Sequence, residues 1–183
     1  MRRALLGVVV VLVAVCGCGR KSPKPGQSIP TYDAKTGKLV KLEADLNHNG
    51  KIDTWTVMDG ALPVRTEQDQ NEDGVVDRWE FMDAKGQIER AVMSKVGDPK
   101  RPWRWETYKD GLLILVEEDT NGDGRPDKWE KHLGVTITSV EFDTHFNGVP
   151  DRRLTFGKNG EVALVETQPD GAGGYLSKVA PKK

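Results

Sequence analysis

The sequence predicts an all-β protein, an antiparallel meander of repeated β-hairpins. Three observations support this prediction. A loop rich in acids and amides recurs about every 24 residues along the 183-residue chain. Short segments rich in β-branched residues flank the loops, and some alternate apolar and polar positions, as residues 136–142 do. Turn dipeptides such as Asp59-Gly60 and Asn159-Gly160 lie between consecutive loops. We therefore expect each unit to contain a strand, a loop, a second strand and a tight turn.

Residues 1–18 have the pattern of an export signal. Two arginines precede an apolar run over residues 4–15, which is too short to be a comfortable bilayer span. The segment resembles a bacterial lipoprotein signal peptide, in which a small residue precedes the cysteine that becomes lipidated. Gly17 favours Cys18 as that residue, with Cys16 as the alternative. An ordinary secretory leader that is cut just after these residues is the other interpretation.

The lipoprotein resemblance implies that the protein is exported and held in the cell envelope by a lipid anchor. Gly19, rather than an aspartate, follows the lipidated position, and by resemblance to Gram-negative lipoproteins this favours the outer membrane. Residues 19–30 contain several prolines and are predicted to form a flexible tether. We expect a single β-repeat domain over 31–176 and a disordered basic tail over 177–183.

The recurring loops follow the pattern D-x-[DN]-x-[DN]-G-x-x-D, and the clearest copy begins at Asp119. The pattern resembles the calcium loops of EF-hands, dockerins, thrombospondin type 3 repeats and FG-GAP repeats, which implies Ca²⁺ as a cofactor. An α-fold of tandem EF-hand-like helices is the alternative. It would need a helix on each side of every loop, and about 12 residues per unit are too few for two helices and a turn. We therefore expect the calcium-type loops to lie along one edge of the sheet.

Three loops supply the predicted metal ligands at positions 1, 3, 5, 7, 9 and 12, where position 7 acts through its backbone carbonyl. Two loops are complete and the third lacks the final glutamate. The predicted ligands are Asp69, Asn71, Asp73, Val75, Asp77 and Glu80; Asp119, Asn121, Asp123, Arg125, Asp127 and Glu130; and Asp45, Asn47, Asn49, Lys51 and Asp53.

Other units depart further from the pattern. The loop at Asp143 is a weaker candidate because it has His145 at position 3, and histidine is a poor ligand for a hard cation. A unit aligned at Lys95 has lost every ligand position, and a decayed sixth unit begins at Gln168. Asx-turns without metal are the alternative interpretation of the loops. They would leave three carboxylates within nine residues repelling one another.

Two sets of glutamates are candidates for the outermost ligand of the complete loops. Glu106 persists in the unit that lacks all other ligands, which suggests that a glutamate at position 12 is a strand residue. Glu67 and Glu117 lie two residues before their loops and are the alternative outer ligands, either directly or through water. The ligand-free unit has Met93 at that place.

Tryptophans recur at position 11 of the units. On strands, they would stack as a ladder along one face of the sheet. We interpret them as core residues in preference to a sugar-binding platform. The residues concerned are Trp55, Trp79, Trp105 and Trp129.

The sequence contains no catalytic constellation, so we do not expect an enzyme. Its three histidines are scattered, and it has neither a nucleophile motif nor a phosphate loop. The net charge is −1, without the basic patch that nucleic-acid binding requires. The leading hypothesis is a calcium-binding envelope lipoprotein that acts as a non-catalytic structural or interaction module. The alternative is a metal-independent β-repeat surface lipoprotein that binds a protein or polysaccharide partner.

Overall fold

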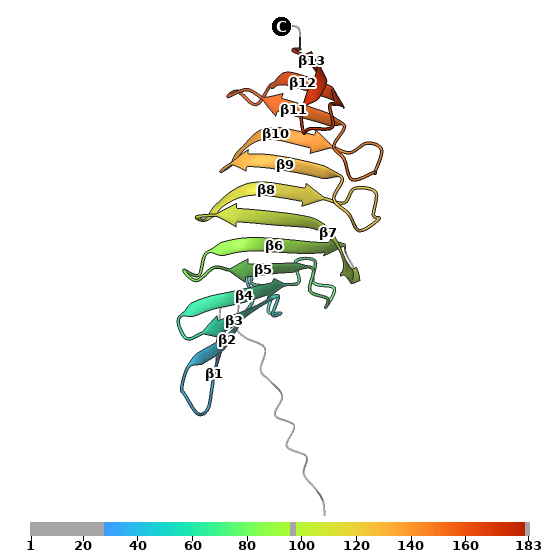
Figure 1. Ribbon diagram of the computed structural model, residues 1–183. Helices are drawn as coiled ribbons and strands as arrows, with labels where there is room; N and C mark the ends of the chain where they lie inside the picture. Colours follow the sequence, from blue (N-terminus) through green and yellow to red (C-terminus); the bar gives the residue numbers. More distant parts are fainter. Residues whose placement is uncertain (1–27, 96–97, 182–183) are drawn as a thin grey trace, which may run out of the picture.

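The computed structural model describes residues 28–95 and 98–181, which form one antiparallel sheet of 13 strands (Figure 1). Strand order in the sheet equals sequence order, so each strand pairs only with its neighbours along the chain. The all-β meander is thereby confirmed. These residues contain no helix, and hence none that could cross a membrane. The proposed signal peptide, both cysteines and most of the tether lie outside the described residues.

The strands are short apart from the seventh. They are β1 (Ile29–Tyr32), β2 (Leu39–Ala44), β3 (Thr54–Asp59), β4 (Leu62–Gln68), β5 (Arg78–Met82), β6 (Ile88–Lys95), β7 (Asp98–Lys109), β8 (Leu112–Glu118), β9 (Lys128–Leu133), β10 (Thr136–Phe142), β11 (Arg152–Phe156), β12 (Val162–Pro169) and β13 (Tyr175–Val179).

The sheet extends beyond both expected domain boundaries. It begins at Ile29, inside the expected tether, and it ends at Val179, inside the expected tail. The first tail residues are ordered because they belong to β13, in which Lys178 pairs with Glu166 of β12. The tail prediction for residues 177–179 is therefore wrong.

Long loops and tight turns lie on opposite edges of the sheet. The loops at Asp45, Asp69, Asp119 and Asp143 join β2 to β3, β4 to β5, β8 to β9 and β10 to β11. The unit aligned at Lys95 has no such loop. Its strands β6 and β7 continue as a ladder until Lys95 pairs with Asp98. The four loops therefore form two consecutive pairs that the β6–β7 hairpin separates.

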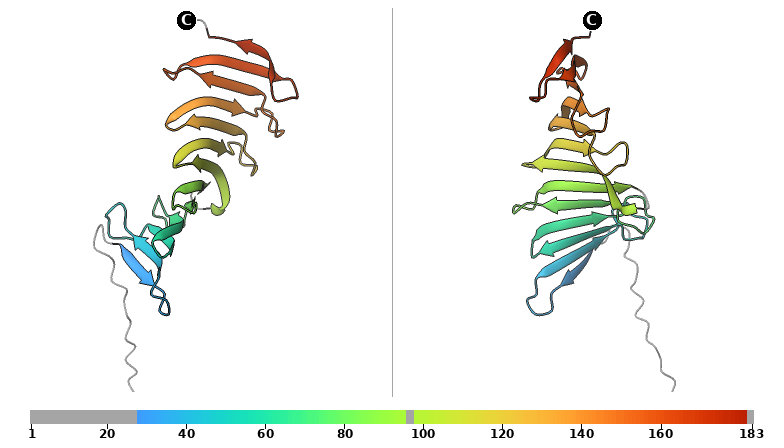
Figure 2. Two further views of the ribbon diagram at one scale, coloured as in Figure 1. Left: turned by 60° about the vertical axis from the view of Figure 1, so that its left-hand side comes forward. Right: turned by 45° about the vertical axis from the view of Figure 1, so that its right-hand side comes forward.

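A β-bulge recurs in every hairpin that a tight turn closes. In each one the even-numbered strand has one extra residue that the register skips. Bulges bend a strand and increase its twist, and Figure 2 shows the sheet twisting along its length. The skipped residues are Val40, Val64, Glu89, Ile114, Thr138 and Ala163.

One face of the sheet carries the tryptophan row. The register places Trp55, Trp79, Trp105 and Trp129 in line across the strands, as predicted. Glu67 and Glu117 lie between them, and Val92 separates the middle two tryptophans. Val92 thus takes the place that sequence alignment assigns to Met93, because β6 and β7 carry their own register shifts.

The interpretation of these tryptophans as core residues needs correction. Within the described residues no second layer covers either face of the sheet, and all four indoles are only half-buried. In the described part of the chain, the fully buried apolar residues are Ala91, Val116, Val140 and Tyr175. The first three lie in one row on the face opposite the tryptophans.

Charged side chains cover these small apolar residues. Glu106 is only 6 % exposed. It accepts hydrogen bonds from Arg78 at 3.1 Å, Arg104 at 3.0 Å and Tyr108 at 2.8 Å. Acids and bases alternate outward from this centre across β5 to β9. We call this set the charge ladder: Arg78, Glu80, Arg104, Glu106, Glu118, Lys128 and Glu130.

Candidate metal loops

The first aspartate of each loop is buried and organises the loop backbone. Asp45, Asp119 and Asp143 are each 2 % exposed, and Asp69 is 5 % exposed. In all four loops, Oδ2 of this aspartate accepts a hydrogen bond from the N–H of the glycine at position 6, over 2.6 to 2.9 Å. A short carboxylate can reach this N–H because the chain folds back at the glycine. That turn requires the left-handed φ that Gly124, at 92°, shows.

The side chains at positions 3 and 5 make Asx-turns. Asn71 accepts the N–H of Asp73 at 2.9 Å, and Asp73 accepts the N–H of Val75 at the same distance. The equivalent bonds recur in the loops at Asp45 and Asp119. Each of these oxygens retains a second lone pair. The loops therefore adopt the turn geometry that either interpretation of the sequence expects.

Position 4 is left-handed in every loop, which the sequence pattern does not mark. The φ angles are 64° at His48, 59° at Glu72, 81° at Gly122 and 54° at Phe146. Left-handed backbone is strained for residues other than glycine. Only the loop at Asp119 has a glycine there. In the other three loops the left-handed residue is strained, and the other interactions of the loop must offset that cost.

The aspartate at position 9 closes each loop. Asp127 accepts the N–H groups of Thr120 at 3.0 Å and Asn121 at 3.1 Å. Asp53, Asp77 and Asp151 close their own loops in a similar way. Hydrogen bonds from the backbone to the acids at positions 1 and 9 thus fold each loop back on itself.

The predicted outer ligands lie on the sheet, away from this arrangement. Glu80 and Glu130 belong to the charge ladder, where Arg78 binds Glu80 at 2.8 Å and Lys128 binds Glu130 at 2.6 Å. Glu67 and Glu117 belong to the tryptophan row. The loops span positions 1 to 9. Two of these glutamates lie before their loops and two lie after them.

The loop aspartates have no protein cation to neutralise them. Among the described residues, no lysine or arginine forms an ion pair with the acids at positions 1, 5 or 9. The single basic contact is His145 Nδ1, which lies 2.7 Å from Asp151 Oδ2. Burial would raise the pKa of Asp151, but hydrogen bonds from Thr144 and His145 outweigh it and lower that pKa. The charge ladder differs, because each ladder acid has a lysine or arginine partner.

Glu72 is a loop residue that the sequence analysis missed. Its carboxylate accepts hydrogen bonds from the side-chain amides of Asn47 and Asn49, and it lies 3.6 Å from Lys51 Nζ. It therefore bridges the loop at Asp69 to the loop before it. The signal available in the sequence was a fourth acid inside that loop, at a position that the calcium pattern leaves free.

Two carboxylate oxygens at the loop edge are buried and have no hydrogen-bond partner. They are Oδ1 of Asp69 and Oδ1 of Asp143. An unpaired buried charge is costly, and the oxygen donors nearby are of the kind that a hard cation binds. In the described part of the chain, however, no three acids, histidines or cysteines converge as a ready metal cluster. A cation would need amide or carbonyl oxygens or water to complete its shell.

Comparisons with known proteins give no family for this chain. No protein-family model matches the sequence, and no curated protein matches it. Among solved structures, the sheet is similar to a chain of the accessory secretory protein 1, 2 and 3 crystal structure from Streptococcus pneumoniae, with 18 % sequence identity and a TM-score of 0.39. That similarity covers 51 % of this chain and only 18 % of the other. A function for this chain therefore has to come from its own residues.

Proposed function

We propose that this protein is a calcium-binding β-repeat module of the cell envelope, non-catalytic and structural or interacting in role. One observation carries the proposal. The position-1 aspartates of all four loops, together with Asp53 and Asp127, are buried, and in the described residues they form no ion pair with a lysine or arginine. The ladder glutamates of the same sheet each have such a partner. Crowded carboxylates repel one another unless a cation neutralises them. Calcium fits because carboxylates, amides and carbonyls are its preferred ligands.

The proposed ligands lie within positions 1 to 9 of the loops. In the loop at Asp69 they are Asp69, Asn71, Asp73 and Asp77, with the carbonyl of Val75. The loop at Asp119 offers the equivalent set. The glutamates at position 12 are left out because Arg78 and Lys128 already bind them. The loop at Asp45 is a poorer candidate, since Glu72 already accepts from its two asparagines.

Bound calcium would stabilise the sheet at its loop edge. The position-1 N–H of a loop often bonds to the preceding hairpin, as that of Asp69 does to the carbonyl of Asp53 at 2.9 Å. Ordering one loop therefore orders its neighbour. Any ligand that binds only the folded state adds its binding free energy to stability. Millimolar to submillimolar affinity would suffice outside the cytoplasm.

The envelope location rests on the sequence of residues 1–18, and Cys18 is the proposed lipid attachment site. Replacing Cys18 with serine should abolish fatty-acid labelling of the protein in cells. Labelling that persists would move the anchor to Cys16. The open faces of the sheet then supply the interaction surface, and a protein or a polysaccharide is the proposed class of partner.

Calorimetry tests the metal proposal. Calcium should bind the purified protein, and Asp73→Ala and Asp123→Ala should each remove one site. Asp59→Ala is the matched control, because this acid ends β3 at the opposite edge and pairs with Lys38 there. Chelation should lower the melting temperature of the wild type. A wild-type protein that neither binds calcium nor responds to chelation would contradict the proposal and favour the metal-independent alternative.

A further inference from the structure

The four loops act as two pairs, and each pair has the same junction. Within a pair, the position-1 N–H of the second loop donates to the position-9 carbonyl of the first. Asp69 N lies 2.9 Å from Asp53 O, and Asp143 N lies 2.8 Å from Asp127 O. The loop at Asp119 has no loop directly before it, and its Asp119 N–H donates to the carbonyl of Trp103 in β7.

Among the described residues, buried carboxylate oxygens without a hydrogen bond occur only at these junctions. Asp69 and Asp143 begin the second loop of each pair, and in the described residues they are the loop acids whose Oδ1 is buried without a hydrogen bond. The first loops differ. Oδ1 of Asp45 accepts the N–H of Asn49 at 3.1 Å, and Oδ1 of Asp119 accepts the N–H of Asp123 at 3.2 Å. The same defect thus appears at both places where one loop follows another.

A cavity lies at each junction and takes its lining from both loops. At the first junction Asn47 and Asp53 of one loop face Asp69 and Gln70 of the next. At the second junction the cavity is lined by Asp123, Arg125, Pro126, Asp127, Asp143, Phe146 and Gly148. Both cavities therefore contain the position-9 acid of the first loop and the position-1 acid of the second.

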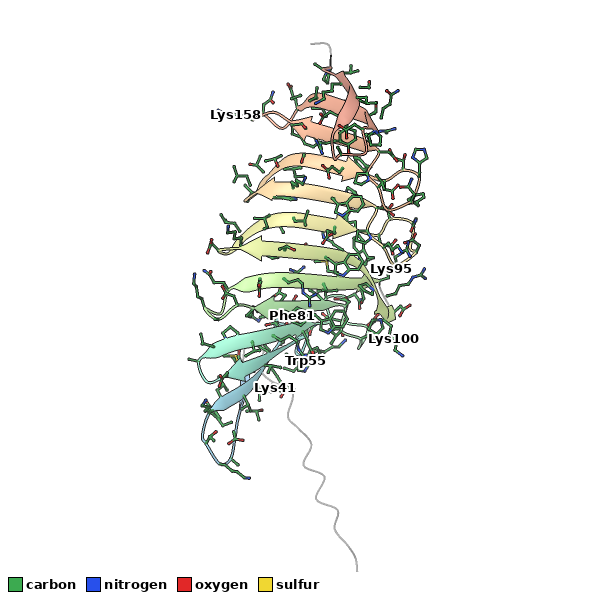
Figure 3. All side chains as sticks on the ribbon, in the orientation of Figure 1. Lys41, Trp55, Phe81, Lys95, Lys100 and Lys158 are labelled. Atoms are coloured by element: carbon green, nitrogen blue, oxygen red, sulfur yellow. The ribbon has the colours of Figure 1, made fainter. Side chains whose placement is uncertain are left out.

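Basic side chains do not neutralise these cavities. Arg125 lines the second cavity but makes no ion pair with Asp127 or Asp143. Lys95 and Lys100 lie at the loop edge as well (Figure 3), but they belong to the hairpin between the pairs. Lys95 and Arg101 approach the loop at Asp119 beside Gly122, and none of these three residues lines the second cavity. A buried carboxylate oxygen that lacks a donor is compensated by an ordered water, by protonation or by a cation from solvent. Two acids from different loops line each cavity, and this favours the cation.

We propose that each junction binds one hard divalent cation, of the calcium class, which two consecutive loops share. The inference rests on the proposed function and deepens it, because it assigns the cation to a pair of loops. Oδ1 of Asp69 or of Asp143 is a direct ligand. Asp53 or Asp127 supplies the second negative charge, and amide oxygens, carbonyls and water complete the shell. Such a cation joins two adjacent hairpins, so the pair of loops is the binding unit.

A double-substitution experiment with calcium tests the sharing. Calorimetric stoichiometry is measured for Asp127→Asn, for Asp143→Asn and for both together. A shared site predicts that each single variant and the double variant lose the same one cation. Independent loops predict that the double variant loses two, which would overturn the inference while leaving calcium binding intact. Absence of calcium binding by the wild type would instead overturn the proposed function as well. The same cycle applies to Asp53→Asn and Asp69→Asn.

A melt without calcium provides a second readout that does not depend on stoichiometry. Asp69→Asn and Asp143→Asn remove a buried charge whose Oδ1 has no partner and whose Oδ2 accepts the glycine N–H. Each should therefore melt at a higher temperature than the wild type in chelator. Both should also bind calcium at least about tenfold more weakly. Asp119→Asn is the matched control, and it should melt lower in chelator because both oxygens of Asp119 accept backbone hydrogen bonds. A lower melting temperature for Asp69→Asn and Asp143→Asn in chelator would contradict an unpaired charge at the junctions.

Discussion

The charge ladder and the loop edge bury acids to a similar degree and compensate them in different ways. Glu106 in the ladder is 6 % exposed, and Asp119 in a loop is 2 % exposed. Two arginines and a tyrosine hold Glu106. Backbone N–H groups alone hold Asp119. The same chain thus stabilises buried carboxylates in two ways. In the ladder a basic side chain neutralises the charge, whereas in the loops backbone N–H groups donate hydrogen bonds and the negative charge remains.

Side-chain length and strand spacing explain the difference. Neighbouring strands lie about 4.8 Å apart, so long side chains in one row reach across a strand. Ala91 lies between Glu80 and Glu106, and its small side chain lets Arg78 of β5 reach Glu106 of β7. An aspartate in a nine-residue loop reaches little beyond its own backbone. The ladder should therefore respond to substitution and pH, and the loop edge should respond to calcium.

The largest effect is expected at the centre of the ladder. Glu106→Ala leaves Arg78 and Arg104 without their shared partner above the buried Ala91. Breaking a buried pair from one side typically costs about 3 to 5 kcal/mol, and we expect about 3 kcal/mol because Arg104 retains Glu118. Urea unfolding followed by tryptophan fluorescence measures the change. Glu161→Ala is the control, since this acid lies at an exposed tight turn, and it should change stability by less than about 0.5 kcal/mol. Equal stability of the two variants would show that the ladder contributes nothing specific.

Removal of calcium is expected to have the next largest effect, and only at the loop edge. A cation present at about 100 times its dissociation constant stabilises the folded state by about 2.7 kcal/mol. Chelation should lower the free energy of unfolding by roughly that amount. In the described residues no ladder side chain bonds to a loop aspartate, so chelation should destabilise Glu106→Ala as much as it destabilises the wild type. Differential scanning calorimetry with and without chelator checks both statements. A smaller response in the variant would mean that the two regions are coupled.

The sequence predicts the hairpin repeat well but misses the charge ladder. The reason is the sequence separation of the residues that interact in each. Loop ligands such as Asp119 and Gly124 are close in sequence, so a local pattern reveals them. Glu106 and Arg78 meet across 28 residues. Their only local trace is a base and an acid two positions apart, as in Arg104 and Glu106. Such spacing is equally typical of a solvent-exposed strand, because the sequence does not show that no second layer covers the sheet.

The junctions were beyond sequence analysis for a related reason. Asp69 and Asp143 occupy the same motif position as Asp45 and Asp119, and nothing local distinguishes them. Their unpaired oxygens depend on whether another loop precedes them in space. The unit at Lys95 has no loop, so no loop directly precedes the one at Asp119. The loss of the ligand residues at Lys95 is visible in the sequence. The loops therefore differ more in whether another loop directly precedes them in the sheet than in their number of predicted ligands.

Acid should weaken the ladder by a smaller amount than either change above. Burial would raise the pKa of Glu106, but hydrogen bonds from Tyr108 and Arg104 and the charge of Arg78 lower it below its ordinary value. The pKa of Glu130 is also lowered, because Lys128 outweighs its burial. A lowered folded pKa adds stability above the unfolded value of about 4.3, and that stability is lost as pH falls through the folded pKa. Melting temperatures measured in chelator from pH 6 downward should fall below about pH 5.

The matched variant for this test is Glu106→Gln. It cannot ionise, so its melting temperature in chelator should depend less steeply on pH than that of the wild type. Parallel pH curves for the two proteins would show that Glu106 does not contribute to the acid sensitivity. The comparison between wild type and variant isolates Glu106, so it is more informative than the slope of either curve.

Glu72 offers the smallest and sharpest test, because it is an acid at the loop edge that has protein partners. It should therefore behave like a ladder acid. Glu72→Gln should lower stability by less than about 1 kcal/mol, since the carboxylate is partly exposed and exposed ion pairs contribute little. The loss should be the same with and without calcium, because Asn47, Asn49 and Lys51 occupy the carboxylate in both conditions. Calorimetric melts in the two conditions measure it. A loss confined to calcium-saturated protein would instead make Glu72 a calcium ligand. Glu72 would then belong with the loop aspartates that need a cation, and not with the ladder acids that have protein partners.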